Sequence, residues 1–110
     1  MGVGIRIGVQ KIMDGATTTG AQTAVRPNGA KQTFQAMGTT SSGAGASVVT
    51  IQVSNDNVDW VTLGAITLTL ATTSSSDGFA SNAPWEYARA YVTSISGTGA
   101  AVTAYMGVEV

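Results

Sequence analysis

Apolar and polar residues alternate with a period of two along most of this chain, and that pattern constrains the fold more than any other feature. It is clearest in "SVVTIQVS", where Val49, Ile51 and Val53 share one face of an extended backbone. It returns in "ITLTL", residues 66–70, whose isoleucine and leucines also share a face. A helical period of 3.6 residues hardly appears. The sequence therefore predicts an all-β protein.

The same alternation predicts strands in four more segments: "VGIRIGVQKI", "KQTFQAM", "WEYARAYVTSI" and "AVTAYMGVEV". In the third, an aromatic face alternates with an alanine face, so we expect both faces to be covered. The aromatic face consists of Trp85, Tyr87, Arg89 and Tyr91. The opposite face consists of Ala88, Ala90 and Val92. The apolar faces of the other segments are Val3, Ile5, Ile7 and Val9; Phe34 and Ala36; and Val102, Ala104, Met106, Val108 and Val110, the last of which we expect to point inward.

Three segments between these strands have the composition of loops. Residues 14–30 contain several turn formers, and we expect a loop there with one weak strand near residues 22–25. Residues 38–46 and 72–84 are small and polar, and we expect them to be loops, with Phe79 reaching from the second one into the core. Gly64 interrupts the alternation, which indicates either a β-bulge or a short turn.

Seven to eight short strands separated by turns favour an antiparallel β-sandwich with jelly-roll or Greek-key connections. At 110 residues, the chain is expected to form a single sandwich domain spanning residues 1–110. Residues 1–12 lie at the start of the chain, and we expect them to be a strand or arm that can contact a neighbouring molecule.

Composition excludes more functions than any motif supports. The chain has no cysteine and no histidine, which removes disulfides, thiol nucleophiles, catalytic triads and His-based metal sites. Five basic and six acidic residues make no basic patch, so nucleic acid is not an expected partner. No apolar run is long enough to span a membrane. Only 10% of residues are charged, which suits a protein that packs against other subunits. We expect no enzyme activity, no cofactor, and no catalytic or metal-binding residues.

The polar cluster in "SNDNVDW" is the strongest candidate for a binding site. It contains Asn55, Asp56, Asn57 and Asp59, whose alternating oxygens resemble those of a calcium loop. An EF-hand is excluded because the glycine and glutamate that it requires are missing at the corresponding positions. We favour a hairpin turn in which Asn and Asp side chains accept backbone hydrogen bonds, followed by Trp60 in the core.

Other candidate residues also have simple structural explanations. The glycine pairs Gly43/Gly45 and Gly97/Gly99 lie between expected strands, which favours turns and loops over a phosphate site. The carboxylates are few and scattered: Asp14, Asp56, Asp59, Asp77, Glu86 and Glu109. Four aromatic residues could stack on sugar rings, although we favour a core or interface role for the tryptophans. They are Trp60, Trp85, Tyr87 and Tyr91.

The second half of the chain resembles small β-sandwich capsid decoration, or cement, proteins of tailed bacteriophages. The residues that carry this resemblance are "SNDNVDW", the "DGF" segment, "PWEYARAYVTSISGTGA" and the valine-rich C-terminal strand, within residues 46–110. The "SND…W" pattern also recurs in galactose-binding sandwiches of the discoidin type. The resemblance to decoration proteins implies a structural role without catalysis.

A decoration protein would sit on the outer surface of a phage head after synthesis in the host cytoplasm. Its partners would be the major capsid protein and copies of itself, as dimers or trimers at symmetry axes, and it would bridge neighbouring capsid subunits. A carbohydrate- or receptor-binding module of a head or tail fibre is the first alternative. A tail structural subunit is the second.

Overall fold

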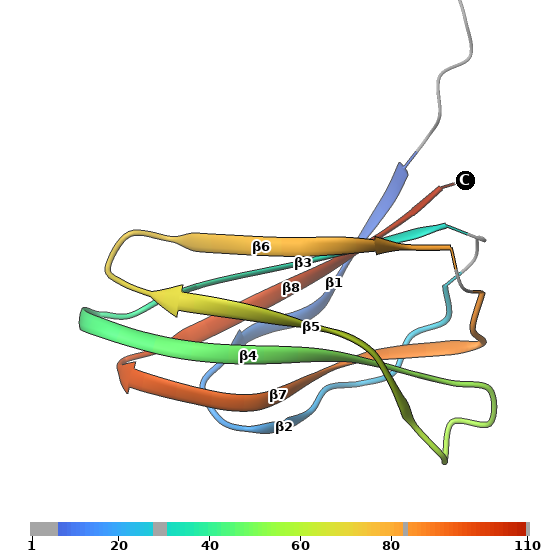
Figure 1. Cartoon of the computed structure of the whole chain (residues 1–110), viewed down its shortest axis with the longest axis horizontal. Helices are drawn as coiled ribbons and strands as arrows, with labels where there is room; N and C mark the ends of the chain where they lie inside the picture. The colour runs from blue at the N-terminus through green and yellow to red at the C-terminus, as the bar shows by residue number, and fades with distance from the viewer. Residues whose placement is uncertain (1–6, 28–30, 83, 110) are drawn as a thin grey trace, which may run out of the picture.

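The computed structural model describes residues 7–27, 31–82 and 84–109. These residues form eight strands in two four-stranded antiparallel sheets that pack as a sandwich (Figure 1). The strands are β1 (Ile7–Ala16), β2 (Gly20–Ala21), β3 (Gln32–Thr39), β4 (Ser42–Ser54), β5 (Val61–Leu70), β6 (Ser75–Ser81), β7 (Tyr87–Thr98) and β8 (Ala101–Glu109). We call β1-β8-β3-β6 sheet A and β2-β7-β4-β5 sheet B. The predicted all-β sandwich is confirmed.

Strand pairing is nested: β1 pairs with β8, β2 with β7, β3 with β6, and β4 with β5. The chain is therefore one long antiparallel hairpin that has been rolled up, so that successive pairs fall alternately in sheet A and sheet B. This arrangement is a jelly roll, one of the two topologies that the sequence left open. The β4–β5 hairpin is the tip of the rolled ribbon, and it joins two neighbouring strands of the same sheet.

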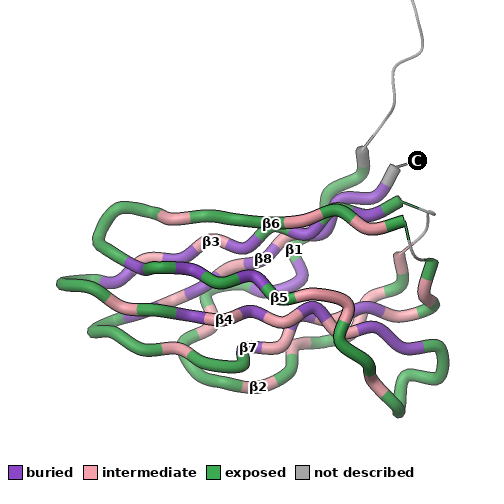
Figure 2. Tube along the Cα trace, in the orientation of Figure 1, coloured by how far each residue is buried: buried purple, intermediate pink, exposed green. Residues whose placement is uncertain are grey.

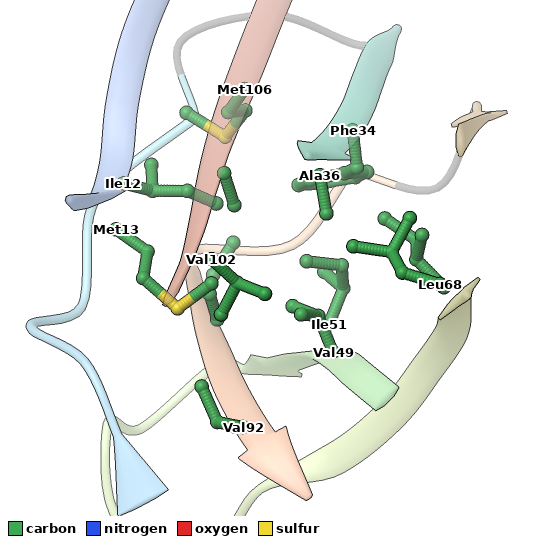
Figure 3. Packing of buried hydrophobic residues seen from close by; sticks show 14 of the residues in the cluster. Ile12, Met13, Phe34, Ala36, Val49, Ile51, Leu68, Val92, Val102 and Met106 are labelled. Carbon is green, nitrogen blue, oxygen red and sulfur yellow. The ribbon is translucent and has the colours of Figure 1, made fainter. Parts of the chain in front are cut away.

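The core fills the space between the two sheets (Figures 2 and 3). Alternate residues of β4 point inward, and Val49 and Ile51 have no exposed surface. Phe34 is 2% exposed, so its ring adds about 1.5–3 kcal/mol to the free energy of unfolding. The apolar faces predicted for β3, β4 and the second half of β5 point inward. On β7 the alanine face is buried in the core, whereas the aromatic face, expected to be covered as well, is half-buried. The predicted inward face of β8 is confirmed for Val102, Ala104, Met106 and Val108.

A β-bulge, rather than a turn, interrupts β5. Ile51 lies opposite Gly64, whereas Gln52 lies opposite Thr62, so Leu63 is an extra residue on β5. Because side chains alternate between the two faces of a strand, one extra residue reverses which positions point inward. Even-numbered residues face outward before the bulge and inward after it. This reversal decides where Trp60 lies.

Phe79 packs against the core, as predicted, but it does so from a strand. It lies on β6, and its ring is 5.4 Å from that of Phe34. Gly64 leaves room for it, because a Cβ at Gly64 would lie only 2.7 Å from Cζ of Phe79. These contacts bring β5 and β6 together across the sandwich, and the ribbon drawing shows the two strands on the same side of the molecule (Figure 1).

Two of the three segments that were predicted to be loops are largely strand, and the third, residues 14–30, is mostly loop in its described part. β3 and β4 extend through most of residues 38–46, and β6 occupies the middle of residues 72–84. Within residues 14–30, β1 continues to Ala16, and the weak strand predicted near residues 22–25 begins earlier, as β2 at residues 20–21. Gln22 and Val25 continue the pairing to β7 through backbone hydrogen bonds and an isolated bridge. Strand pairing uses backbone groups and does not require large side chains. Because the side chains of these strand segments are mostly small and polar, the sequence shows no alternation of apolar and polar residues there.

The N-terminal strand also differs from the prediction. Residues 7–12 of the expected arm belong to β1 and pair with the chain's own β8, while residues 1–6 lie outside the described part of the chain. Val9 belongs to the apolar face of this predicted strand, yet it is 68% exposed. The register explains this, because Val9 lies opposite Gly107 on the outer side of sheet A, and bulges after Lys11 then turn Ile12 and Met13 inward.

Candidate functional site

The polar cluster after β4 forms a hydrogen-bonded turn. The Ser54 hydroxyl is buried and accepts hydrogen bonds from the backbone N–H groups of Asp56 and Asn57, at 3.2 and 3.0 Å. Oδ1 of Asp56 accepts from the N–H groups of Val58 and Asp59 and from the Ser54 hydroxyl, at 2.8–2.9 Å. Asn57 has a φ of 60°, a left-handed conformation that Asn tolerates better than most residues. The predicted Asn/Asp turn is confirmed.

These donors keep the Asp56 carboxylate ionised. Hydrogen bonds to the carboxylate lower the pKa of Asp56 far below its ordinary value. The largest effect comes from the backbone N–H of Asp59, followed by the backbone N–H of Val58 and then the Ser54 hydroxyl. The carboxylate therefore stabilises the folded turn at all pH values above that ordinary pKa, and its contribution is lost as the pH falls through the lowered value. At neutral pH the turn carries a fixed negative charge.

The calcium hypothesis would require Asn55, Asn57 and Asp59 to converge on one ion, and no contact among these three side chains is seen in the described residues. Asn55 instead accepts a hydrogen bond at 3.2 Å from the backbone N–H of Glu86, which ties the turn to the segment before β7. Within residues 7–27, 31–82 and 84–109, no three His, Cys, Asp or Glu side chains are grouped closely enough to hold a metal ion. The turn therefore has a clear structural role and no assembled set of ligands.

Trp60 lies on the outer face of sheet B, so the prediction of a core tryptophan is wrong. The residue is half-buried and lies just before the bulge, in the frame that points outward. The Arg89 guanidinium stacks over its ring at 4.1 Å, and Nε of Arg89 donates a hydrogen bond of 2.8 Å to Gln52. The two strands thus hold the indole on the surface of the sheet by a cation–π contact.

A second arginine–aromatic pair lies on the same face. Nη2 of Arg26 donates a 2.7 Å hydrogen bond to the Tyr87 hydroxyl, and the guanidinium stacks on the Tyr87 ring at 5.0 Å. Glu86 approaches Arg26 at 3.6 Å. These bonds raise the pKa of Arg26, mainly through Tyr87, so the arginine remains charged. Of the proposed sugar-stacking residues, Trp60, Tyr87 and Tyr91 share this outer region, whereas Trp85 packs against the core.

The outer face of sheet A has a different character. The strand residues of its central part are uncharged with one exception, Lys11, which pairs with Asp14 at 3.6 Å and lies 5.8 Å from the Tyr105 ring. Glu109 also lies on this face by register, at the end of β8. Sequence reasoning missed this surface, because its residues come from four strands that only the topology brings together. By strand register, its central part consists of Val9, Lys11, Thr33, Gln35, Met37, Ser76, Gly78, Ala80, Thr103 and Tyr105.

The glycine pairs let the start of β4 approach the end of β7 closely, and they do not form a phosphate site. A Cβ on Gly45 would lie 2.2 Å from the Ser96 carbonyl oxygen, and one on Gly97 would lie 2.9 Å from Cα of Gly45. This close approach requires glycine. Gly43 and Gly45 belong to β4 and Gly97 to β7, so only Gly99 lies in a turn as predicted.

Asp56 and Asp59 lie in the same turn, and the other described carboxylates are spread over the molecule. Asp77 accepts a hydrogen bond from the Gly78 N–H, while Asp14 and Glu86 pair with cations. Two hollows, of about 180 and 230 Å³, lie at opposite ends of the sandwich. The first is lined by residues of β3, β6 and β8, and the second by Thr17 and the β7–β8 turn region, with no converging set of reactive groups in either.

The fold and its surfaces define an eight-stranded jelly-roll sandwich. No family model matches this chain, and searches of curated proteins and solved structures also gave no match. In the part of the chain that the structure describes, no helix has the length and hydropathy needed to cross a membrane.

Proposed function

We propose that this chain is a structural protein of a phage particle, a decoration protein that binds the outside of a head and bridges neighbouring major capsid subunits. The sequence resemblance of residues 46–110 first suggests this role. The jelly roll is compatible with it, since the fold recurs in viral capsid proteins, although it also occurs in lectins and alone decides nothing.

The observation that carries the proposal is the outer face of sheet A. Two neighbouring antiparallel strands of this face, β3 and β6, present Thr33, Gln35, Ser76 and Ala80 as exposed, uncharged side chains. A surface of this kind can be buried against another protein without desolvating charges, which is the main penalty of a polar interface. Many identical copies around a head would make even a modest contact effective through multivalency.

Sheet B gives less support to the glycan-binding alternative. A sugar site needs an aromatic ring with free polar groups around it, but Arg89 covers one face of Trp60 and is itself bonded to Gln52. Arg26 and Tyr87 are likewise bonded to each other. The groups that would recognise a sugar are therefore engaged within the protein. A tail structural subunit would use the same uncharged face, so the choice of target particle must separate it from a head protein.

The test is binding of the purified protein to expanded phage heads that lack it, with tails and a glycan array as competing targets. Gln35→Glu and Gln35→Lys would place a charge of either sign at the middle of the outer face of sheet A. We expect each to weaken head binding by roughly a hundredfold, because burying an unpaired charge costs about 3 kcal/mol.

Thr67→Glu and Thr67→Lys are the matched controls, because Thr67 is an exposed strand residue on sheet B. Both should bind heads as the unmodified chain does. Wild-type protein that binds tails or glycans but not heads would overturn the proposal. Equal effects at residues 35 and 67 would show that the outer face of sheet A is not the contact.

A further inference from the structure

The β4–β5 hairpin ends in a tip, residues 55–61, that extends from the body of the sandwich at the lower right of Figure 1. Val58 at this tip is 74% exposed, the largest exposure among the large hydrophobic side chains of the described residues, and Val61 is 48% exposed. An apolar side chain that protrudes on a turn, rather than lying in a flat surface, has the shape of an anchor that inserts into a partner.

The tip is already ordered before any contact is made. Ser54 and Asp56 bind four backbone N–H groups of the turn, and Asn55 ties it to Glu86. Behind it, Trp60 is held under Arg89. Because a preorganised loop loses little conformational entropy on binding, a small anchor on it can contribute measurably to affinity.

Charge indicates the chemistry of the partner. Asp56 and Asp59 flank Val58, both are exposed, and neither forms an ion pair with any residue that the structure describes. The lowered pKa of Asp56 keeps its carboxylate charged. An apolar side chain between two carboxylates is complementary to an apolar depression with lysine or arginine at its rim.

A second copy of this chain does not offer such a rim among its described residues. Lys11 pairs with Asp14, Arg26 with Glu86, and Arg89 bonds Gln52 and covers Trp60. Lys31 also has a partner. Because the described cations of this chain already have partners, we assign the complementary cations to a different protein.

We propose that the hairpin tip is a preformed docking element that inserts Val58 into an apolar depression, rimmed by basic residues, on a neighbouring capsid protein subunit. This inference rests on the proposed function, and it supplies the second contact that a bridging protein needs besides the outer face of sheet A. The tip and that face belong to different sheets, so they can engage two different subunits.

Titration of heads lacking the protein with Val58→Ser and Asp59→Lys variants tests the inference. We expect Val58→Ser to weaken binding by roughly tenfold or more, because it removes the buried apolar group. Asp59→Lys should weaken binding by about tenfold at low salt and less at high salt, because it reverses a charge at the rim. Thr73→Lys, in the exposed turn between β5 and β6, is the control and should bind as wild type does.

The outcomes separate this inference from the function on which it rests. Thermal unfolding of each variant at the wild-type temperature would establish that the fold is intact. If wild-type protein fails to bind heads, the proposed function and this inference both fail. If wild type binds and Val58→Ser binds equally well, only the inference is overturned. It is also overturned if Val58→Ser dissociates an oligomer of this chain while its affinity for heads is unchanged.

Discussion

The two outer faces of the sandwich are built from the same kind of strand, yet they differ in how their side chains are used. On sheet B, Trp60, Arg89 and Gln52 contact one another, as do Arg26 and Tyr87. On sheet A, Gln35 and Thr33 are exposed, and no side-chain hydrogen bond among the described residues joins them to a neighbour. The comparison teaches that the large polar and aromatic side chains of sheet B stabilise their own sheet, whereas Gln35 and Thr33 at the centre of sheet A make no such contact.

The largest loss of stability should come from a substitution on the inner faces of the sheets, and it is the reference for the smaller losses expected on the outer faces. Phe34→Ala removes a buried ring that packs on Phe79. We expect it to lower the free energy of unfolding by about 3–5 kcal/mol, because a cavity remains between the sheets. Chemical denaturation measures this loss, and a loss below about 1 kcal/mol would mean that the two sheets are not held together at this point.

A smaller loss is expected at the end of β4. Ser54→Ala leaves two backbone N–H groups of the turn without their acceptor, and Ser54 is 1% exposed. The expected cost is about 1–3 kcal/mol. Ser41→Ala is a suitable control, because its hydroxyl donates one hydrogen bond in an exposed turn. Equal stability of the two variants would contradict the account of the turn.

Trp60→Ala tests the outer face of sheet B directly. Removal of a core tryptophan would lower the free energy of unfolding by at least about 3 kcal/mol. Removal of a half-buried ring that packs under one arginine should lower it by only about 1 kcal/mol. In a double-mutant cycle with Arg89→Ala, the two losses should be less than additive, because they remove one shared contact. Full additivity would show that the stacked pair contributes nothing.

Sequence alone predicted the parts of the fold in which large apolar residues alternate. Residues 48–54 and 102–108 have Val, Ile, Met or Ala at every second position, and both are strands with the predicted inward faces. β6 escaped prediction because "SSDGFAS" is an edge strand held by backbone pairing to β3 and contains one large apolar residue. Nothing in local composition distinguishes such a strand from a loop.

The errors at Trp60 and Val9 both concern which face of a strand points inward. Trp60 lies before the bulge at Leu63, which reverses the alternation, and Gly64 indicated a bulge or a turn without deciding between them. On β1, alternation alone does not tell the inner face from the outer one, and the register to β8 places Val9 outside. The turn at residues 54–59 was predictable, because Ser, Asn and Asp accept hydrogen bonds from nearby backbone groups. The outer face of sheet A was not, since its residues are far apart in the chain and individually unremarkable.

The smallest expected effect concerns pH and is confined to the hairpin tip. The pKa of Asp56 is lowered by the N–H groups of Asp59 and Val58. The turn should therefore keep its hydrogen bonds as the pH falls past 3.8, the ordinary value for this carboxyl, and lose them only in stronger acid. Amide chemical shifts of Val58 and Asp59, followed by NMR during acidification, report this change. A midpoint at the ordinary value would contradict the network.

Footprinting of the protein bound to heads is the most direct test of the difference between the two faces. Hydroxyl radicals modify accessible Met and Tyr side chains. The partly exposed Met37 and Tyr105 lie on the outer face of sheet A, whereas the partly exposed Tyr91 lies on that of sheet B. The account predicts that binding to heads protects Met37 and Tyr105 and leaves the reactivity of Tyr91 unchanged. Protection of Tyr91, with Met37 and Tyr105 still reactive, would contradict it.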